Sequence, residues 1–216
     1  MKIEVKNVSK TFRRVEVIRD VSVTFESGKI YGLVGKNGSG KSVFLKMLCS
    51  FYIPNKGVIL QDGYNYIKRN EFPKSTRALI DKPNFISDLT GFENLKALAK
   101  INGNVGDEEI LKVMEDVNLL QDKDKLYWEY SLGMKQKLGI AQVLMEDVDF
   151  MIFDEPFIAV DEESVQKIKT IIKSRMNKDK IIIMTSHIMD DINELCDEVY
   201  EFKYGVLTKY EGNNNK

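Results

Sequence analysis

The sequence has few residues that could cross-link it and no excess of charge of either sign. Its 216 residues include two cysteines, Cys49 and Cys196, which lie far apart and lack the C-x-x-C spacing of redox and metal motifs. Two isolated cysteines favour buried thiols in a reducing compartment over a disulfide framework. The 32 Lys and Arg residues nearly balance the 33 Asp and Glu residues. Bulk charge therefore gives no reason to expect nucleic acid as a partner.

Long apolar runs are also missing. No stretch approaches the ~20 consecutive apolar residues that a membrane-spanning helix needs, and the opening stretch MKIEVKNVSK lacks the apolar segment of a secretion signal. We therefore expect a soluble cytoplasmic chain, with any membrane span supplied by a separate protein. The 43% of apolar residues is enough for one compact domain or two small lobes.

Hydrophobic patterning predicts an α/β fold, because strand patterns alternate with helical ones. Helical periodicity runs from about 88 to 145, opens with a capping box at Thr90 and Glu93, and returns at about 161–177. The C-terminal GNNNK is expected to fray. The segments that read as strands are, in chain order, 3–8, 16–25, 29–34, 57–66, 77–81, 148–153, 180–187 and, as a hairpin, 197–210.

A glycine-rich loop between a predicted strand and a predicted helix is the most specific motif. In GLVGKNGSGKS, Gly35, Gly38 and Gly40 fall close together although glycine is costly to order. The pattern Gly35-x4-Gly40-Lys41-Ser42 has the spacing of the phosphate-binding loop called Walker A. Backbone N–H groups of such a loop form an anion nest, and the following helix adds its positive dipole end. Lys41 would reach the β- and γ-phosphates, and the Ser42 hydroxyl would hold Mg²⁺.

Two adjacent carboxylates, Asp154 and Glu155, follow the apolar run VDFMIF. Carboxyl ends of parallel strands are where α/β sheets bind ligands. Asp154 would hold Mg²⁺, usually through water, and Glu155, pointing the other way along the strand, would polarise the attacking water. An ordinary acidic turn would explain the pair if the glycine-rich loop were absent.

His187 and Ser131 each allow a structural and a functional interpretation. His187 follows the buried run IIIMTS, where a core or capping histidine is the better interpretation in isolation, but beside a γ-phosphate it is a candidate phosphate sensor. Ser131 and Gly133 precede a helical pattern and would form a second anion site. Without context, a serine N-cap explains Ser131 better.

Together these motifs resemble, over essentially the whole chain, the nucleotide-binding subunit of an ABC transporter. Walker A spans 35–42 and Walker B 150–155, YSLGMKQKLGIA corresponds to the signature motif, the D-loop FIAVD ends at Asp161, and His187 is the switch histidine. Phe12, in VSKTF, stands where the family stacks an aromatic ring on adenine.

The resemblance implies a single ABC ATPase domain over 1–216. Its P-loop NTPase (RecA-like) core and N-terminal antiparallel β-subdomain would occupy 1–86 and 134–216, and an inserted helical subdomain about 87–133. The chain would bind ATP and Mg²⁺ and hydrolyse ATP. The residues implied as catalytic are Glu155, His187 and Lys41; as nucleotide-binding, Phe12, Gly35, Lys36, Asn37, Gly38, Ser39, Gly40, Lys41, Ser42, Val43, Ser131, Gly133 and Asp161; as metal-binding, Ser42, Asp154 and Asp81.

The resemblance also implies partners. Two copies would close head to tail on two ATP molecules, each of which meets the Walker motifs of one copy and the Ser131 and Gly133 of the other. A separate transmembrane permease subunit would hold the chain on the cytoplasmic face of the cell membrane. The segments SLGMKQ and LTGFENL resemble bacterial exporters of the antimicrobial-peptide immunity or multidrug type. The cargo, and whether the cassette pair is identical or mixed, stay open.

Several positions depart from the family pattern. Val43 replaces a second hydroxyl, so one nucleotide contact is lost. Leu132 replaces the first signature glycine and Met134 the glutamine, whereas the serine and the second glycine remain. Asp81, in ALIDKP, stands at the place of the Q-loop glutamine. A carboxylate there can join the Mg²⁺ or water shell, but it cannot donate a hydrogen bond when ionised.

Two other functions compete with transport. Soluble ABC-type ATPases of DNA repair or translation usually carry a coiled-coil insert or two fused cassettes, for which this chain is too short. A P-loop GTPase or kinase is the other alternative. A GTPase would need Asn-Lys-x-Asp, and NKDK at 177–180 has lysine at the decisive position. The transport ATPase is the favoured interpretation.

Overall fold

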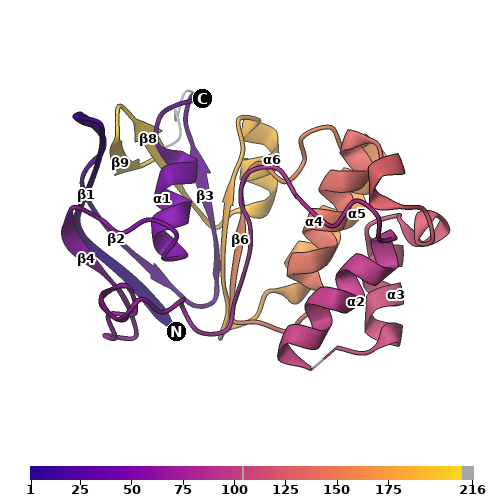
Figure 1. Ribbon diagram of the computed structural model, residues 1–216. Coiled ribbons are helices and arrows are strands. Elements are labelled where there is room, and N and C mark those ends of the chain that lie inside the picture. The colour runs from indigo at the N-terminus through magenta and orange to yellow at the C-terminus, as the bar shows by residue number, and fades with distance from the viewer. Residues whose placement is uncertain (104, 211–216) are drawn as a thin grey trace. The chain divides into compact units, whose positions relative to one another are not determined.

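The computed structural model describes residues 1–103 and 105–210, which form two compact units (Figure 1). The C-terminal GNNNK, which the sequence analysis expects to fray, lies outside the described residues. The predicted helical insert of about 87–133 falls inside the second unit, but its boundaries stay a prediction. The first unit comprises Met1–Ile80, Asp149–Glu155 and Met176–Lys216, and the second Asp81–Val148 and Pro156–Arg175.

The first unit contains a small antiparallel sheet at its N-terminal end, as the sequence predicts. Its strand order is β2-β1-β4. Alternating residues of these strands, such as Ile3, Val5 and Phe25, are buried on one face, which explains the period-two pattern. The strands are β1 (Lys2–Phe12), β2 (Val15–Glu26) and β4 (Lys56–Gln61).

A second sheet of the same unit has the order β5-β6-β7-β3-β8-β9, and all its pairings are parallel except that of β8 with β9. Its central strands β6 and β7 are buried along their whole length, as strands covered on both faces should be. The predicted closing hairpin is β8 and β9. The strands are β3 (Lys29–Val34), β5 (Thr76–Leu79), β6 (Phe150–Phe153), β7 (Ile181–Thr185), β8 (Glu198–Lys203) and β9 (Val206–Lys209).

Helix α1 (Lys41–Leu48) lies between the two sheets of the first unit (Figure 1). Phe44 and Leu45 are fully buried and belong to one core with side chains of both sheets. Helix α6 (Met189–Leu195), which the sequence analysis does not predict, packs on β3. A Cβ on Gly32 would lie 2.7 Å from the Ile192 Cγ2 atom, so only glycine allows this approach. The unit also holds a short 3₁₀ turn, η1 (Ile67–Arg69).

The second unit is helical. The predicted capping box is confirmed, since Thr90 Oγ1 accepts from Glu93 N at 3.1 Å and Glu93 Oε2 accepts from Thr90 N at 2.8 Å. We expected helical structure to run continuously from about 88 to 145. This prediction is wrong in one part, because 3₁₀ turns and loops separate the third and fourth helices. The elements are α2 (Gly91–Asn102), α3 (Asp107–Asp116), η2 (Leu120–Asp122), η3 (Tyr127–Glu129), α4 (Leu132–Leu144) and α5 (Glu162–Arg175).

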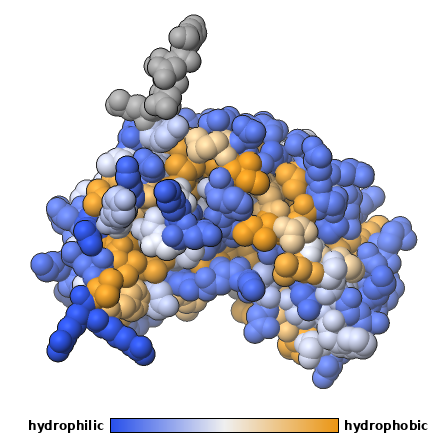
Figure 2. Space-filling model, turned by 90° about the horizontal axis from the view of Figure 1, so that it is seen from above, coloured by the Kyte–Doolittle hydropathy of each residue, from blue (hydrophilic) through white to orange (hydrophobic). Residues whose placement is uncertain are grey.

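Polar and apolar residues are interspersed on the surface, and Figure 2 shows hydrophilic residues over most of the face seen from above. In the part of the chain that the structure describes, no helix combines the length and the apolar character required to cross a bilayer.

Glu198 joins three strands of the large sheet through its carboxylate. Glu198 Oε1 accepts from Lys29 Nζ of β3 at 2.6 Å, and Oε2 accepts from Lys209 Nζ of β9 at 2.9 Å. These hydrogen bonds, that of Lys29 foremost, hold the pKa of Glu198 at about 2, well below the usual value of a glutamate carboxyl.

We expect Glu198→Gln to destabilise the protein at pH 7 by about 1 kcal/mol, the upper end for pairs with largely exposed lysines. A lowered folded-state pKa stabilises the protein above pH 4.5, and this contribution is lost as the pH falls through about 2. The difference between Glu198→Gln and the unchanged protein in urea unfolding should therefore shrink on acidification below pH 4.5. A difference that stays constant from pH 7 to pH 3 would contradict the role of the ionised carboxylate.

Candidate functional site

The loop between β3 and α1 has the backbone that its glycines predict. Gly35, Gly38 and Gly40 have φ angles of +149°, +77° and +116°. A Cβ on Gly35 would lie 2.4 Å from the carbonyl oxygen of Phe202, so no larger residue fits there. Gly40 is the N-cap of α1 and makes no side-chain capping bond. The first-turn N–H groups of α1 therefore face the loop with the positive end of the helix dipole.

A cavity of about 260 Å³ opens at this loop. The Ser39 hydroxyl is buried and has no hydrogen-bond partner among residues 1–103 and 105–210. A buried polar group of this kind is satisfied when a ligand oxygen accepts from it. The cavity is lined by Val17, Asn37, Gly38, Ser39, Gly40, Lys41, Ser42, Val43 and Glu155.

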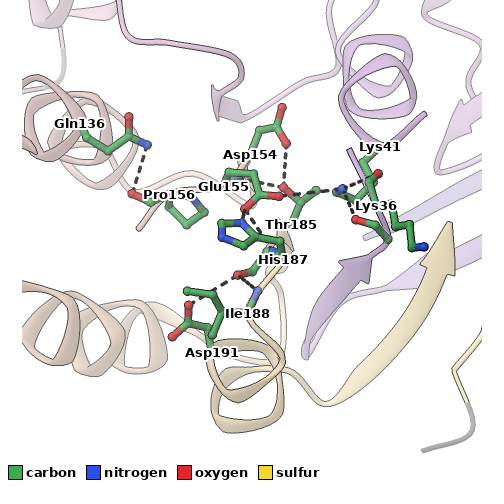
Figure 3. Close-up of polar contacts among 12 residues, drawn as sticks. Lys36, Lys41, Gln136, Asp154, Glu155, Pro156, Thr185, His187, Ile188 and Asp191 are labelled. Carbon is green, nitrogen blue, oxygen red and sulfur yellow. Dashed lines mark hydrogen bonds and ion pairs between the residues drawn. The ribbon is translucent and has the colours of Figure 1, made fainter. Parts of the chain in front are cut away.

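Lys41 is held over the loop that precedes it. Its side chain is 6% exposed, and its Nζ donates to the Gly35 carbonyl oxygen at 2.6 Å and to that of Lys36 at 3.5 Å. The same Nζ lies 3.9 Å from Glu155 Oε1. One buried ammonium therefore connects the loop after β3 with the carboxylate after β6 (Figure 3).

The predicted carboxylate pair lies directly after β6, beside the end of β7. Phe153 of β6 pairs with Met184 of β7 in a parallel register, so Asp154 comes next to Thr185. Asp154 is 6% exposed, and its Oδ1 accepts from Thr185 Oγ1 at 2.7 Å. The backbone N–H of Glu155 donates to the same hydroxyl oxygen at 2.8 Å.

The direction of Glu155 is not set by strand alternation, and that part of the prediction is wrong. The strand ends at Phe153, and Glu155 has a left-handed backbone with φ of +49°. This turn brings its Oε2 to 2.8 Å from His187 Nδ1 and to 3.2 Å from the His187 backbone N–H, which donates to it. The carboxylate thus lies between the ammonium of Lys41 and the imidazole (Figure 3).

His187 is neither a core residue nor the cap of α6. Its side chain is 55% exposed, and the N-cap of α6 is Ile188. The structure places its imidazole beside the Glu155 carboxylate, and its role as a γ-phosphate sensor stays a prediction.

The predicted signature and D-loop residues belong to the second unit. Ser131 is the N-cap of α4, and its Oγ accepts from Met134 N at 3.2 Å. A Cβ on Gly133 would lie 2.4 Å from the Ala159 carbonyl oxygen, so the signature glycine contacts the D-loop closely. Leu132 between them is 54% exposed.

Asp161 caps helix α5 and is held in its ionised form. Its Oδ1 accepts from Ser164 N at 2.9 Å, and its Oδ2 lies 3.3 Å from Lys137 Nζ. The Ser164 backbone N–H, with the nearby Lys137, lowers the pKa of Asp161 to about 2. Asp81 is exposed at the first position of the second unit and has φ of +60°.

One residue predicted to bind the nucleotide lies outside the loop cavity, and two residues at the site were not predicted. Phe12 does not line the loop cavity; its ring lies 5.1 Å from that of Tyr52 and 5.0 Å from Lys10 Nζ. Thr185 and Val17 are in contact with the site but were not predicted. Thr185 was detectable, because it is the polar residue that directly follows the apolar run IIIM, two positions before His187.

Protein side chains alone do not form a metal centre in the described part of the chain, since no three His, Cys, Asp or Glu residues cluster there. A Mg²⁺ ion here would therefore need oxygen atoms of a bound ligand or of water as further ligands, which is usual for this ion.

Comparison with known proteins shows the family of this chain. A family model described as ABC transporter matches residues 18–158. YybJ, an uncharacterized ABC transporter ATP-binding protein of Bacillus subtilis (strain 168), is 38% identical over 209 residues, which cover 97% of this chain and 96% of that protein. The bacitracin transport ATP-binding protein BcrA of Enterococcus faecalis is 34% identical over 209 residues, covering 96% of this chain and 68% of that protein.

The fold has a counterpart among solved structures. A dimeric ATP-binding cassette in a post-hydrolysis state, bound to ADP and Pi, superimposes with a TM-score of 0.86 at 19% identity, covering 97% of this chain and 99% of that one. The predicted fold class is thus confirmed. The family model matches residues 18–158, and the relative YybJ matches over 97% of this chain. This chain therefore belongs to the ABC transporter family.

Proposed function

We propose that this chain is the ATP-binding and ATP-hydrolysing subunit of an exporter-type ABC transporter. The observation that carries the proposal is the meeting of Lys41, Glu155 and His187 beside a glycine loop that can cradle phosphates. A soluble ATPase unlinked to transport is not favoured, because the relatives bear transport names.

Nucleotide binding relies on the loop and the start of α1. The N–H groups after Gly40 and the orphaned Ser39 hydroxyl would donate to phosphate oxygens. The Lys41 ammonium would exchange its loop carbonyl partners for the β- and γ-phosphates. Phe12, half-buried at the end of β1, would offer a ring face to adenine. The remaining loop residues that we assign to nucleotide binding are Gly35, Lys36, Asn37, Gly38, Ser42 and Val43.

Ser42 and Asp154 would hold Mg²⁺, and Asp81 is a further candidate ligand. Their hydroxyl and carboxylate oxygens are the hard donors that Mg²⁺ prefers. The ion would neutralise negative charge on the phosphates.

Hydrolysis would begin with Glu155. Its carboxylate would orient a water molecule and take its proton as the water attacks the γ-phosphorus, while ADP leaves. His187, 2.8 Å from this carboxylate, would fix its direction and report the γ-phosphate. Lys41 would stabilise the charge that develops on the phosphate oxygens.

The working unit would be an ATP-dependent homodimer. Ser131 and Gly133 of one copy would contact the ATP held by the loop of the other, with Asp161 nearby. Support comes from the similar cassette that was solved as a dimer with ADP and Pi. Each Ser131 hydroxyl lies at an exposed helix N-terminus, which is a suitable place for a phosphate.

The membrane partner would be a separate permease subunit, with this chain on the cytoplasmic face. BcrA, whose name links it to bacitracin transport, supports an exporter. Closing and opening of the dimer would pass a rigid-body motion to the permease.

Glu155→Gln should bind ATP but hydrolyse it about 10²–10⁴-fold more slowly, because the amide cannot take the proton. We would measure phosphate release and, by light scattering with ATP and Mg²⁺, a persistent dimer. Glu108→Gln, at an exposed site on α3, is the control and should behave as the unchanged protein. Normal turnover by Glu155→Gln would exclude Glu155 as the base.

Lys41→Ala should weaken ATP binding about 10- to 100-fold, because a charge-assisted hydrogen bond to phosphate is lost. Titration with a fluorescent ATP analogue measures this, with the exposed Lys178→Ala as control. Equal affinity of Lys41→Ala and the unchanged protein would refute the assignment of the loop.

A further inference from the structure

Thr185 is a completely buried polar residue at the end of β7, with an exposed fraction of 0%. Its hydroxyl donates to Asp154 Oδ1 at 2.7 Å and accepts from the Glu155 backbone N–H at 2.8 Å. A single oxygen therefore contacts both residues of the carboxylate pair, as Figure 3 shows.

We propose that Thr185 is a positioning residue for ATP hydrolysis, which fixes the Asp154 carboxylate and the backbone turn that presents Glu155. This inference rests on the proposed function. Thr185 contacts neither phosphate nor water in this assignment and acts through the two acidic residues.

The role of the Thr185 oxygen as acceptor in one hydrogen bond determines its role as donor in the other. A backbone N–H can only donate, so the Thr185 oxygen must accept from Glu155. The one hydroxyl proton is therefore directed to Asp154, whose Oδ1 accepts it. A carboxylate fixed in this way has a defined plane before any cation binds, and partners of this kind orient metal ligands in many sites.

The backbone at Glu155 needs such support. A left-handed conformation, here with φ of +49°, is unfavourable for a residue with a Cβ and persists only where surrounding contacts hold it. The bond from its N–H to Thr185 is one of these contacts. The same turn sets the Glu155 carboxylate 3.9 Å from Lys41 Nζ and 2.8 Å from His187 Nδ1.

Packing gives no reason for a hydroxyl at this position. The preceding residues of β7, Ile181 to Met184, are apolar and fully buried. Valine has the shape of threonine and would suit this strand, whereas a buried hydroxyl is unfavourable unless it is hydrogen-bonded. The hydroxyl of Thr185 is thus explained by its bonds to the site.

Thr185→Val tests the hydroxyl with the shape kept, and Thr185→Ser keeps the hydroxyl. We expect Thr185→Val to lower kcat about 10- to 100-fold and to raise the Mg²⁺ concentration for half-maximal activity, as loss of a partner of a metal ligand does. KM for ATP should change little, because the glycine loop is untouched. Thr185→Ser should restore both kcat and the Mg²⁺ dependence towards those of the unchanged protein.

Thr170→Val is a matched control, since the Thr170 hydroxyl donates to the Gln166 carbonyl oxygen on the exposed face of α5. It should leave kcat and the Mg²⁺ dependence unchanged. Thermal unfolding of every variant is measured beside the kinetics. If Thr185→Val lowers only the melting temperature and keeps kcat per folded molecule, the role is structural and the inference is wrong.

Thr185→Cys covers the case in which Thr185→Val does not fold, because a thiol is a weaker donor and acceptor of similar size. Its kcat should then fall below that of Thr185→Ser at equal ATP affinity, and equal kcat values would overturn the inference. Failure of the proposed function looks different. In that case the unchanged protein itself would not hydrolyse ATP, whatever residue stands at position 185.

Discussion

Parallel pairing of β6 with β7, and of β7 with β3, is the constraint on which the site depends. All three strands point the same way, so the segments that follow their carboxyl ends emerge at one edge of the sheet. The glycine loop follows β3, the pair Asp154 and Glu155 follows β6, and His187 follows β7. Lys41 and Glu155, more than a hundred positions apart in the sequence, thereby come within ion-pair distance, and His187 comes within hydrogen-bonding distance of Glu155.

At this edge of the sheet, Lys41 contacts Glu155, and Glu155 in turn contacts His187. The buried ammonium of Lys41 is held by two carbonyl oxygens of its own loop and faces the Glu155 carboxylate. The two oxygen atoms nearest to this ammonium belong to neutral carbonyls, and charged phosphate oxygens are stronger acceptors than these. The Glu155 carboxylate in turn contacts an exposed imidazole. The side of the site that we assign to the phosphates is therefore already assembled.

The second unit carries the motifs that would complete a partner's site. Ser131 at the start of α4 and Asp161 at the start of α5 each act as a helix cap, and Gly133 contacts the loop between them. Both caps sit on helices that pack within the same unit. A surface built in this way suits recognition of a nucleotide held by another copy of the chain.

Local patterns in the sequence determined the elements and the loop chemistry: the alternation in β1 and β2, the capping box of α2, and the left-handed glycines after β3 all depend on neighbours in the chain. The sequence did not show the direction of Glu155, the packing of Phe12 on Tyr52, or the two hydrogen bonds of the Thr185 hydroxyl. These depend on contacts between distant segments. Only the register of β6 against β7 places the Thr185 hydroxyl between two acidic residues, and no periodicity within either strand encodes that register.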